Sequence, residues 1–325
     1  MLSDFLFALN AVFPIFAVAL TGYILKNKGF LTDGFVTVAD KLVFRLLLPC
    51  MLFTKVAYID SGNLTRKEMS LLLYCVVMAI ILCIVLCIFV PIFVKDKAKV
   101  GAFVQGVFRS NVAFLGVPFA TSLFGDEGGT MAAIILAAVV PVYNVMAVIV
   151  LCVFNPDKSN AISPLKRAVK IVKGIITNPL IVSIIIALPF GIFGIGEHIP
   201  GAISKTIGYF SDASTPLAIL LVGASFSFSA FKERAGLAIT AAVLKTVISP
   251  AVFMAIGYYC FGFFGVHIGI IMIIFGTPTA ISSYIMAKNM NSDGPLANQI
   301  VLLTTLFCMV TIFMYSFVMR VIGVF

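Results

Sequence analysis

The stretches "GVPFATS" at residues 116–122 and "GTPTAIS" at residues 276–282 are two copies of one pattern, 160 residues apart in a chain of 325. Each copy lies inside a long apolar run. A glycine and a proline two residues apart weaken a helix, because glycine loosens the backbone and proline removes an N–H donor. We therefore predict an interrupted helix at each copy.

The composition surrounding the two copies is that of a membrane protein. Hydrophobic residues make up 62% of the chain and charged residues 11%, whereas soluble domains are about half apolar and about a quarter charged. The formal net charge of +9 comes from basic residues in short segments between apolar runs. That distribution indicates membrane orientation rather than nucleic-acid binding. We expect a multi-pass protein of the cell membrane, in contact with the lipid bilayer.

Ten apolar runs have the length of about 20 residues that a helix needs to cross the hydrocarbon core. They lie near residues 5–25, 36–57, 69–94, 101–124, 130–154, 174–195, 203–228, 236–261, 266–288 and 296–321. The connections are short, so we expect no attached soluble domain. Thirteen Lys and Arg residues fall in the connections of one side and four on the other. The side richer in basic residues is predicted to be cytoplasmic, which places both termini outside the cytoplasm.

Five spans separate the two copies of the pattern, and five is an odd number. The second copy must therefore cross the membrane in the opposite direction. We predict an all-α membrane protein of two inverted five-helix repeats, residues 1–154 and 174–325, joined by a cytoplasmic linker at 155–173. In many secondary transporters with this architecture, the substrate site lies at mid-membrane between the repeats. Helices 4 and 9 are expected to be broken and crossed there.

Polar residues gather around the two predicted breaks. A broken helix presents free N–H groups and the positive end of its dipole, which suit an anion, and free carbonyls, which suit a cation. The candidate substrate-binding residues near the breaks are Ser110, Asn111, Gly116 and Pro118 in span four and Gly276, Thr277, Pro278, Thr279, Ser282 and Ser283 in span nine.

Two further polar residues, Asn144 in span five and Asp212 in span seven, complete the candidate site. Ionisable residues inside spans are costly and tend to be functional. For Asp212 the alternative is a structural ion pair with a basic residue such as Lys205. Arg109 and Lys245 also lie within spans, and their roles stay open between attracting an anion, reaching toward the membrane surface and pairing with a carboxylate.

The segments "SNVAFLGVP" (110–118), "SDASTPLAILLVGASF" (211–226) and "PTAISSYIMAKNMN" (278–291) resemble the auxin efflux carrier family, which includes plant PIN-type carriers and bacterial organic-anion permeases. "DKLVFRLLLPCMLF" in span two and the asparagine of span five also fit that family. The resemblance covers nearly the whole chain and implies ten spans, a fold shared with bile-acid symporters and a polar site at the helix crossing. It carries Asn111, Pro118 and Pro278 over as site residues. Ser282 and Ser283 stand where the plant carriers have a valine-proline pair, so the plant substrate is not implied.

The resulting hypothesis is a secondary transporter that moves a small organic anion, a carboxylate, by alternating access. A membrane ligand sensor built on a transporter fold is the alternative. No catalytic constellation accompanies the two histidines, so we do not expect an enzyme. No cofactor or metal is expected. The sequence leaves open whether a proton or a sodium ion couples transport and whether the chain forms a homodimer.

Overall fold

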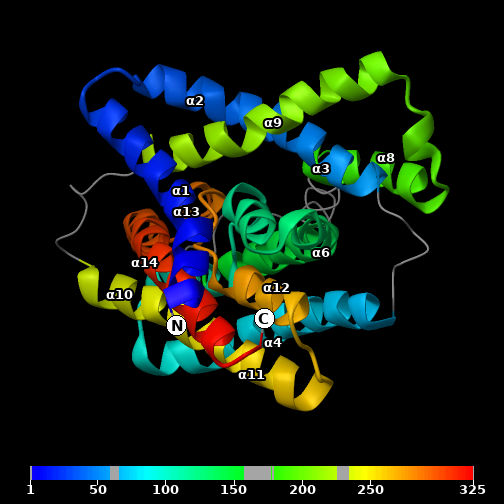
Figure 1. Cartoon of the computed structure of the whole chain (residues 1–325). Coiled ribbons are helices and arrows are strands. Elements are labelled where there is room, and N and C mark those ends of the chain that lie inside the picture. Colours follow the sequence, from blue (N-terminus) through cyan, green and yellow to red (C-terminus); the bar gives the residue numbers. More distant parts are fainter. Residues whose placement is uncertain (1, 59–65, 157–176, 178, 225–233, 325) are drawn as a thin grey trace.

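The computed structural model describes residues 2–58, 66–156, 177, 179–224 and 234–324 (Figure 1). Over these residues the chain is helical, apart from connections and one isolated two-residue bridge. The helical elements in chain order are α1 (Leu2–Asn27), α2 (Asp33–Leu42), η1 (Val43–Leu47), α3 (Leu48–Ala57), α4 (Arg66–Phe93), α5 (Lys97–Phe108), η3 (Val112–Gly116), α6 (Val117–Val153), α8 (Pro179–Ile192), η4 (Ile195–His198), α9 (Gly201–Ala224), α10 (Ala235–Val243), η6 (Leu244–Ile248), α11 (Ser249–Phe261), α12 (Val266–Gly276), α13 (Ser282–Asn289) and α14 (Gly294–Val321).

Described helices lie within each of the ten predicted apolar runs, but they do not form ten separate helices long enough to cross a membrane. Six helical stretches of the described chain are long and apolar enough to cross a membrane: 5–27, 66–93, 112–153, 201–224, 235–261 and 294–321. The stretch 112–153 contains Gly125, whose φ of 64° and ψ of −153° bend α6 between predicted spans four and five. Of the predicted linker 155–173, residues 157–173 lie outside the described residues.

Local sequence explains where several helices begin and end. The Thr32 hydroxyl accepts the Phe35 N–H at the start of α2, and an Asp96 carboxylate oxygen accepts the Ala98 N–H at the start of α5. Such side chains satisfy backbone donors that a first turn leaves free. α11 ends at Gly262, whose left-handed φ of 65° suits glycine.

The helices form two groups in Figure 1. The upper group contains α1, α2, α3, α8 and α9, and within it α1 packs along α9 while α3 contacts both α8 and α9. The lower group contains α4, α5, α6 and α10–α14. α1 also reaches α14 of the lower group, so it connects the two (Figure 1).

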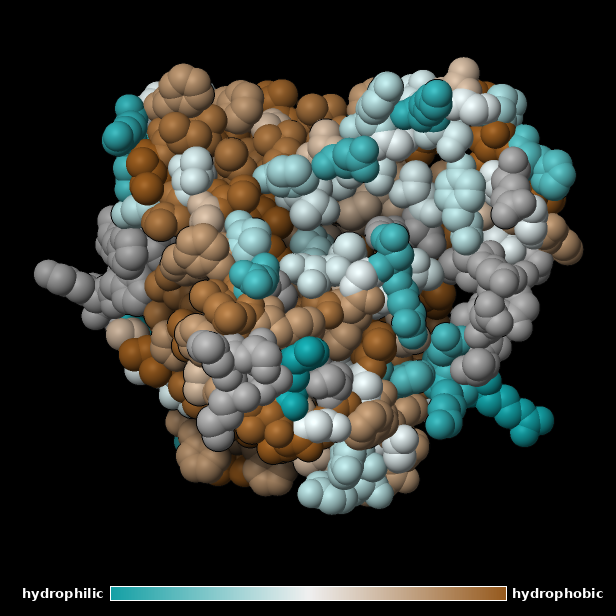
Figure 2. Space-filling view, viewed as in Figure 1, coloured by the Kyte–Doolittle hydropathy of each residue, from teal (hydrophilic) through white to brown (hydrophobic). Residues whose placement is uncertain are grey.

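The core of the lower group surrounds the two helices that precede the interruptions. α5 is buried at every residue from Val100 to Phe108, and α12 is buried at every residue from Ile268 to Gly276. A helix that is apolar on all sides is typically packed against other helices around its whole circumference. On the face shown in Figure 2, hydrophobic residues cover most of the left side, whereas hydrophilic and intermediate residues gather on the right. Large exposed hydrophobic surfaces of this kind are typical of contact with lipid or another protein.

Candidate functional site

The first interruption lies between α5 and η3. α5 ends at Phe108, Arg109 is extended (φ −89°, ψ 115°), and Asn111 (φ −88°, ψ 62°) precedes the π-helical turn η3. The predicted break at Gly116 and Pro118 is therefore misplaced. Gly116 is helical (φ −64°, ψ −52°), and Pro118 directly follows the π-helical turn η3 inside the continuous helical stretch 112–153.

The second interruption lies between α12 and α13, at the second copy of the pattern. α12 ends at Gly276, and Thr277 is extended with φ −64° and ψ 152°. Because Pro278 restricts the residue before it to extended conformations, the local sequence accounts for this helix end. The chain becomes helical again at Ser282.

The two interruptions pair with each other through their main chains. Ser110 and Thr279 form an antiparallel bridge. The N–H of Asn111 donates to the carbonyl oxygen of Pro278 at 2.7 Å, and the N–H of Ala280 donates to that of Arg109 at 3.3 Å. Groups freed by each broken helix are thus satisfied by the other, which is required where no water is available.

Side chains extend this pairing to neighbouring helices. The Ser110 hydroxyl donates to the carbonyl oxygen of Ile274 in α12 at 2.5 Å, and the Thr279 hydroxyl donates to that of Gly106 in α5 at 2.5 Å. The Thr279 N–H donates to the Thr304 hydroxyl of α14 at 3.0 Å. The paired segments 109–111 and 278–280, called the crossing below, are therefore also held by the hydroxyl groups of Ser110, Thr279 and Thr304.

Several polar groups at the crossing have no hydrogen-bond partner in the described part of the chain. They are the hydroxyls of Thr277 and Ser283, both in residues with 0% exposure, and Oε1 of Gln105. Gln105 does use its other amide atom, because Nε2 donates to the Ser283 carbonyl oxygen at 2.8 Å. Buried polar groups without partners are rare and costly, so this cluster marks the crossing as a candidate ligand site.

Two cations are also buried at the crossing. Arg109 is 6% exposed and donates to the Asn144 side-chain oxygen at 2.6 Å and to the Met286 sulfur at 2.8 Å. Lys245 is 0% exposed and donates to the Ser110 hydroxyl. Neither cation forms an ion pair with a carboxylate of the described residues, in contrast to Arg234, which pairs with Asp293.

A cavity of about 890 Å³ lies between the two groups of helices. α1, α3 and α9 of the upper group line one side, and the first turns of α6 with the region of its bend line the other. Pro118 reaches this cavity, as do the two acids Asp126 and Asp212. Its volume is that of a small-molecule pocket.

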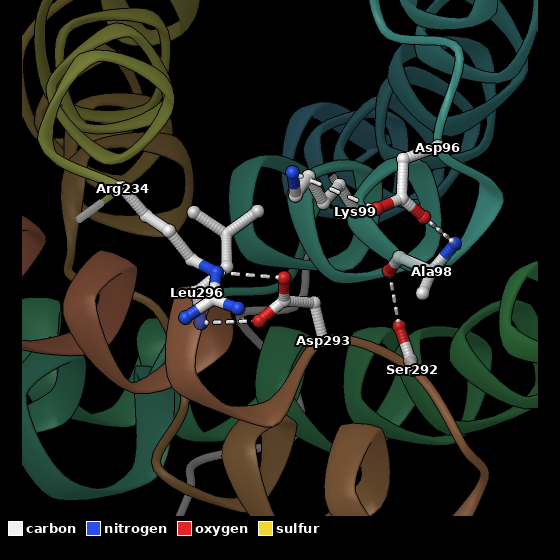
Figure 3. Close-up of polar contacts among 7 residues, drawn as sticks. All are labelled: Asp96, Ala98, Lys99, Arg234, Ser292, Asp293 and Leu296. Carbon is white, nitrogen blue, oxygen red and sulfur yellow. Dashed lines mark hydrogen bonds and ion pairs between the residues drawn. The ribbon is translucent and has the colours of Figure 1, made fainter.

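A cluster of polar contacts holds the turn between α13 and α14 against α5 (Figure 3). The Ser292 hydroxyl donates to the Ala98 carbonyl oxygen at 2.7 Å. The Asp293 carboxylate caps α14 by accepting the Leu296 N–H at 2.9 Å and lies 2.8 Å from Nε of Arg234. These contacts fix the half-helices α5 and α13 to one another on one side of the crossing.

The family of the chain follows from comparison with known proteins. A family model described as "Membrane transport protein" matches residues 7–316. The chain belongs to this family. It is the family of the auxin efflux carriers, so the resemblance seen in the sequence is confirmed, and the family is one of membrane transporters and not of enzymes.

Two curated relatives in this transport family are similar along their whole length. An "uncharacterized transporter" of Methanothermobacter thermautotrophicus is 21% identical over 316 residues, covering 97% of this chain and 99% of the relative. An "uncharacterized transporter" of Methanocaldococcus jannaschii is 22% identical over 314 residues, covering 96% of this chain and 98% of the relative. The membrane-transport assignment thus applies to the chain as a whole.

In the structure of this family member, some of the predicted site residues lie at the crossing and others lie away from it. Ser110, Asn111, Gly276, Thr277, Pro278, Thr279 and Ser283 lie at the crossing, and Asn144 joins them through Arg109. Ser282 begins α13 and is exposed. Asp212 is also exposed and lines the cavity, as does Pro118. These two residues therefore lie at the cavity and not at the crossing.

Sequence reasoning missed Gln105 and Thr304 as parts of the crossing. Each is a polar residue within an apolar run, and polar residues in such runs tend to be functional, so this pattern could have indicated both. Asp126 was missed because it lies between two predicted spans, where an exposed acid is ordinary. In the described chain no group of three His, Cys, Asp or Glu side chains could hold a metal ion.

Proposed function

We propose that this chain is a secondary transporter for a small organic anion, a carboxylate, that binds at the crossing of the two interrupted helices. The observation that carries the proposal is the antiparallel pairing of Ser110 with Thr279 among polar groups that lack partners. An apolar bundle has no structural need for such groups, whereas a bound ligand would supply their missing hydrogen bonds.

The ligand's negative charge is supported by the direction of the helices. η3 and α13 begin next to the crossing, at Val112 and Ser282. The first turn of a helix carries free N–H groups and the positive end of the dipole, so two such starts favour an anion. The side chains proposed to contact it are those of Asn111, Thr277 and Ser283.

The proposed architecture is two inverted five-helix repeats. The segment α5, η3 and α6 and the segment α12, α13 and α14 follow the same order of short buried helix, interruption and continuing helix. Their antiparallel bridge fits segments that cross the membrane in opposite directions. We infer ten spans on this basis, with the short helices α8 and α12 counted as spans, both termini outside the cytoplasm and the chain in the cell membrane.

Alternating access is supported by the position of the cavity. It separates the upper from the lower group next to Pro118, and neither Arg109 nor Lys245 lines it. The crossing is thus closed off from the cavity in this conformation. A shift of one group against the other would expose it to one side of the membrane at a time.

Counterflow in proteoliposomes tests the proposal. Purified full-length protein would be reconstituted with unlabelled acetate, succinate or benzoate inside, and uptake of the same labelled acid would be followed. We expect transient accumulation of at least one acid and none of its neutral amide. A ligand sensor would bind the acid, seen as a raised thermal midpoint, without counterflow. Absence of both effects for all three acids would rule out the proposed function.

A further inference from the structure

Arg109 and Lys245 are two buried positive charges, and the described residues place no negative charge in contact with either of them. Both are buried, and the partners found for them are an amide oxygen, a thioether sulfur and a hydroxyl. Removing a cation from water costs several kcal/mol unless an opposite charge compensates it. Two such cations beside the proposed site call for an anion that the described chain does not supply.

The two side chains lie on opposite sides of the unwound segment. Arg109 is extended, and successive side chains of an extended chain point in opposite directions. Arg109 accordingly contacts Asn144 of α6 and Met286 of α13, whereas Ser110 contacts α12 and Lys245 of η6. The positive charges thus act from both sides on the point where the helices cross.

The hydrogen-bond acceptors found for Arg109 are uncharged, and a carboxylate would be a stronger acceptor than either. A guanidinium carries five N–H donors in a planar fork that fits a carboxylate with two parallel hydrogen bonds. One of its donors is directed at a sulfur, which is a weak acceptor. Asn144 and Met286 are half-buried, so this side of the crossing is less enclosed than that of Lys245.

Lys245 lies deeper and acts through another residue. It belongs to the π-helical turn η6, a type of irregularity that is frequent at functional sites. Its ammonium donates to the Ser110 hydroxyl, which in turn donates to the Ile274 carbonyl oxygen. Lys245 therefore fixes the direction of the Ser110 hydroxyl and the position of the unwound segment.

We propose that Arg109 binds the carboxylate of the transported anion while Asn144 holds its guanidinium, and that Lys245 is a positioning residue that orients Ser110 and adds a second positive charge. This inference rests on the proposed function and assigns its charge-selecting residues. The carboxylate takes the place of the Met286 sulfur at the guanidinium, and the buried cations gain their opposite charge when substrate binds.

The first test measures binding of the named acids by the purified full chain. The thermal midpoint would be recorded with acetate, succinate and benzoate, and with acetamide, succinamide and benzamide as uncharged controls. For Arg109→Gln we expect the acid-induced rise to disappear while the ligand-free midpoint stays equal or increases, since an uncompensated cation is gone. Arg109→Lys should retain part of the rise. Lys288→Gln, which changes an exposed side chain of α13, should retain all of it. A rise retained in Arg109→Gln, or a ligand-free midpoint that falls, would overturn the assignment.

The second test separates positioning from packing at Lys245. Lys245→Met preserves an unbranched side chain without charge. We expect it to raise the KM for counterflow about tenfold or more with little change of the ligand-free midpoint. Ser110→Ala should raise the KM similarly but lower the ligand-free midpoint, because it leaves the buried ammonium of Lys245 without its hydrogen-bond acceptor. The double variant should have no higher a KM than Lys245→Met alone, since that variant already removes both the contact with Ser110 and the positive charge. Additive losses would overturn the role of Lys245.

The outcomes keep the two proposals apart. If the wild type shows counterflow and Arg109→Gln shows it equally, the function stands and the charge-selecting role fails. If the wild type neither binds nor moves any of the acids, the proposed function fails and this inference fails with it.

Discussion

The backbone N–H of Asn111 donates a hydrogen bond of 2.7 Å to the carbonyl oxygen of Pro278, and this bond joins the two interrupted helices of the chain. Each interruption alone would leave backbone groups without partners, at several kcal/mol per group in an apolar surrounding. Paired, the interruptions stabilise each other. The backbone N–H of Asn111 is thereby used in a structural hydrogen bond. No partner for its side-chain amide is found among the described residues, so the amide can bind a ligand.

Asn111→Ala should therefore separate binding from folding. The backbone bond to Pro278 survives the substitution, so we expect the thermal midpoint to change little, as for a change that breaks no described contact. Loss of a hydrogen bond to an anion should lower counterflow about tenfold or more. Asn27→Ala, at the exposed end of α1, serves as the control. Full counterflow by Asn111→Ala would remove this residue from the site.

The sequence could show that the chain is helical and apolar enough to cross a membrane, and six described helical stretches have the length that a bilayer requires. The position of the first interruption was not predictable. Its local sequence contains no proline between Phe108 and Val112, and the helix ends there because Arg109 and Asn111 pair with the partner segment. Pro118, which looked disruptive, does not interrupt the helix, because it follows the π-helical turn η3 within the continuous stretch 112–153. Tertiary pairing thus overrode the local pattern.

The candidate site shows the same limit. Asp212 and Asn111 are both polar residues in apolar runs, yet one lines an open cavity and the other is 7% exposed at the crossing. Which face of a helix meets its neighbours depends on packing that one sequence does not display. For Lys245 the sequence shows its depth in a span, whereas its contact with Ser110 joins residues 135 positions apart.

Asp212 is predicted to carry a coupling proton or to orient a cation, because it lies within a predicted span and lines the cavity. Asp212→Asn removes the carboxyl group and keeps the side chain's size. We expect counterflow between equal pH values to persist and net uptake driven by a pH gradient to be lost. Asp33→Asn, at the start of α2, should behave as the wild type. Unchanged gradient-driven uptake by Asp212→Asn would exclude a proton-carrying role.

The contact between α1 and α9 makes a prediction about stability. A Cβ added at Gly223 would lie 1.7 Å from the Ala19 carbonyl oxygen, so the two helices would have to separate. Overpacking of this kind costs about 1–3 kcal/mol or more, and Gly223→Ala should lower the thermal midpoint markedly. Gly208→Ala, in the same helix with nothing within 4 Å of the added atom, should leave it equal or raise it. Equal midpoints for the two variants would contradict the observed close approach.

The carboxylate of Asp293 has two tasks that substitutions can separate. It caps α14 through the Leu296 N–H and pairs with Arg234, and its side chain is 7% exposed. Asparagine is a good helix cap without charge, so Asp293→Asn should lose the ion pair alone, whereas Asp293→Ala should lose the cap as well, worth about 1 kcal/mol.

We therefore expect the thermal midpoints in detergent to fall in the order wild type, Asp293→Asn, Asp293→Ala. Arg234→Gln should resemble Asp293→Asn, because each removes one partner of the same pair. Lys99→Gln is the matched control, since its pair with Asp96 is exposed and spans 3.6 Å, and such pairs contribute at most about 1 kcal/mol. If Asp293→Asn and Asp293→Ala were equally stable, the capping contact would not stabilise α14, and the turn before it would be held to α5 by Ser292 and the backbone alone.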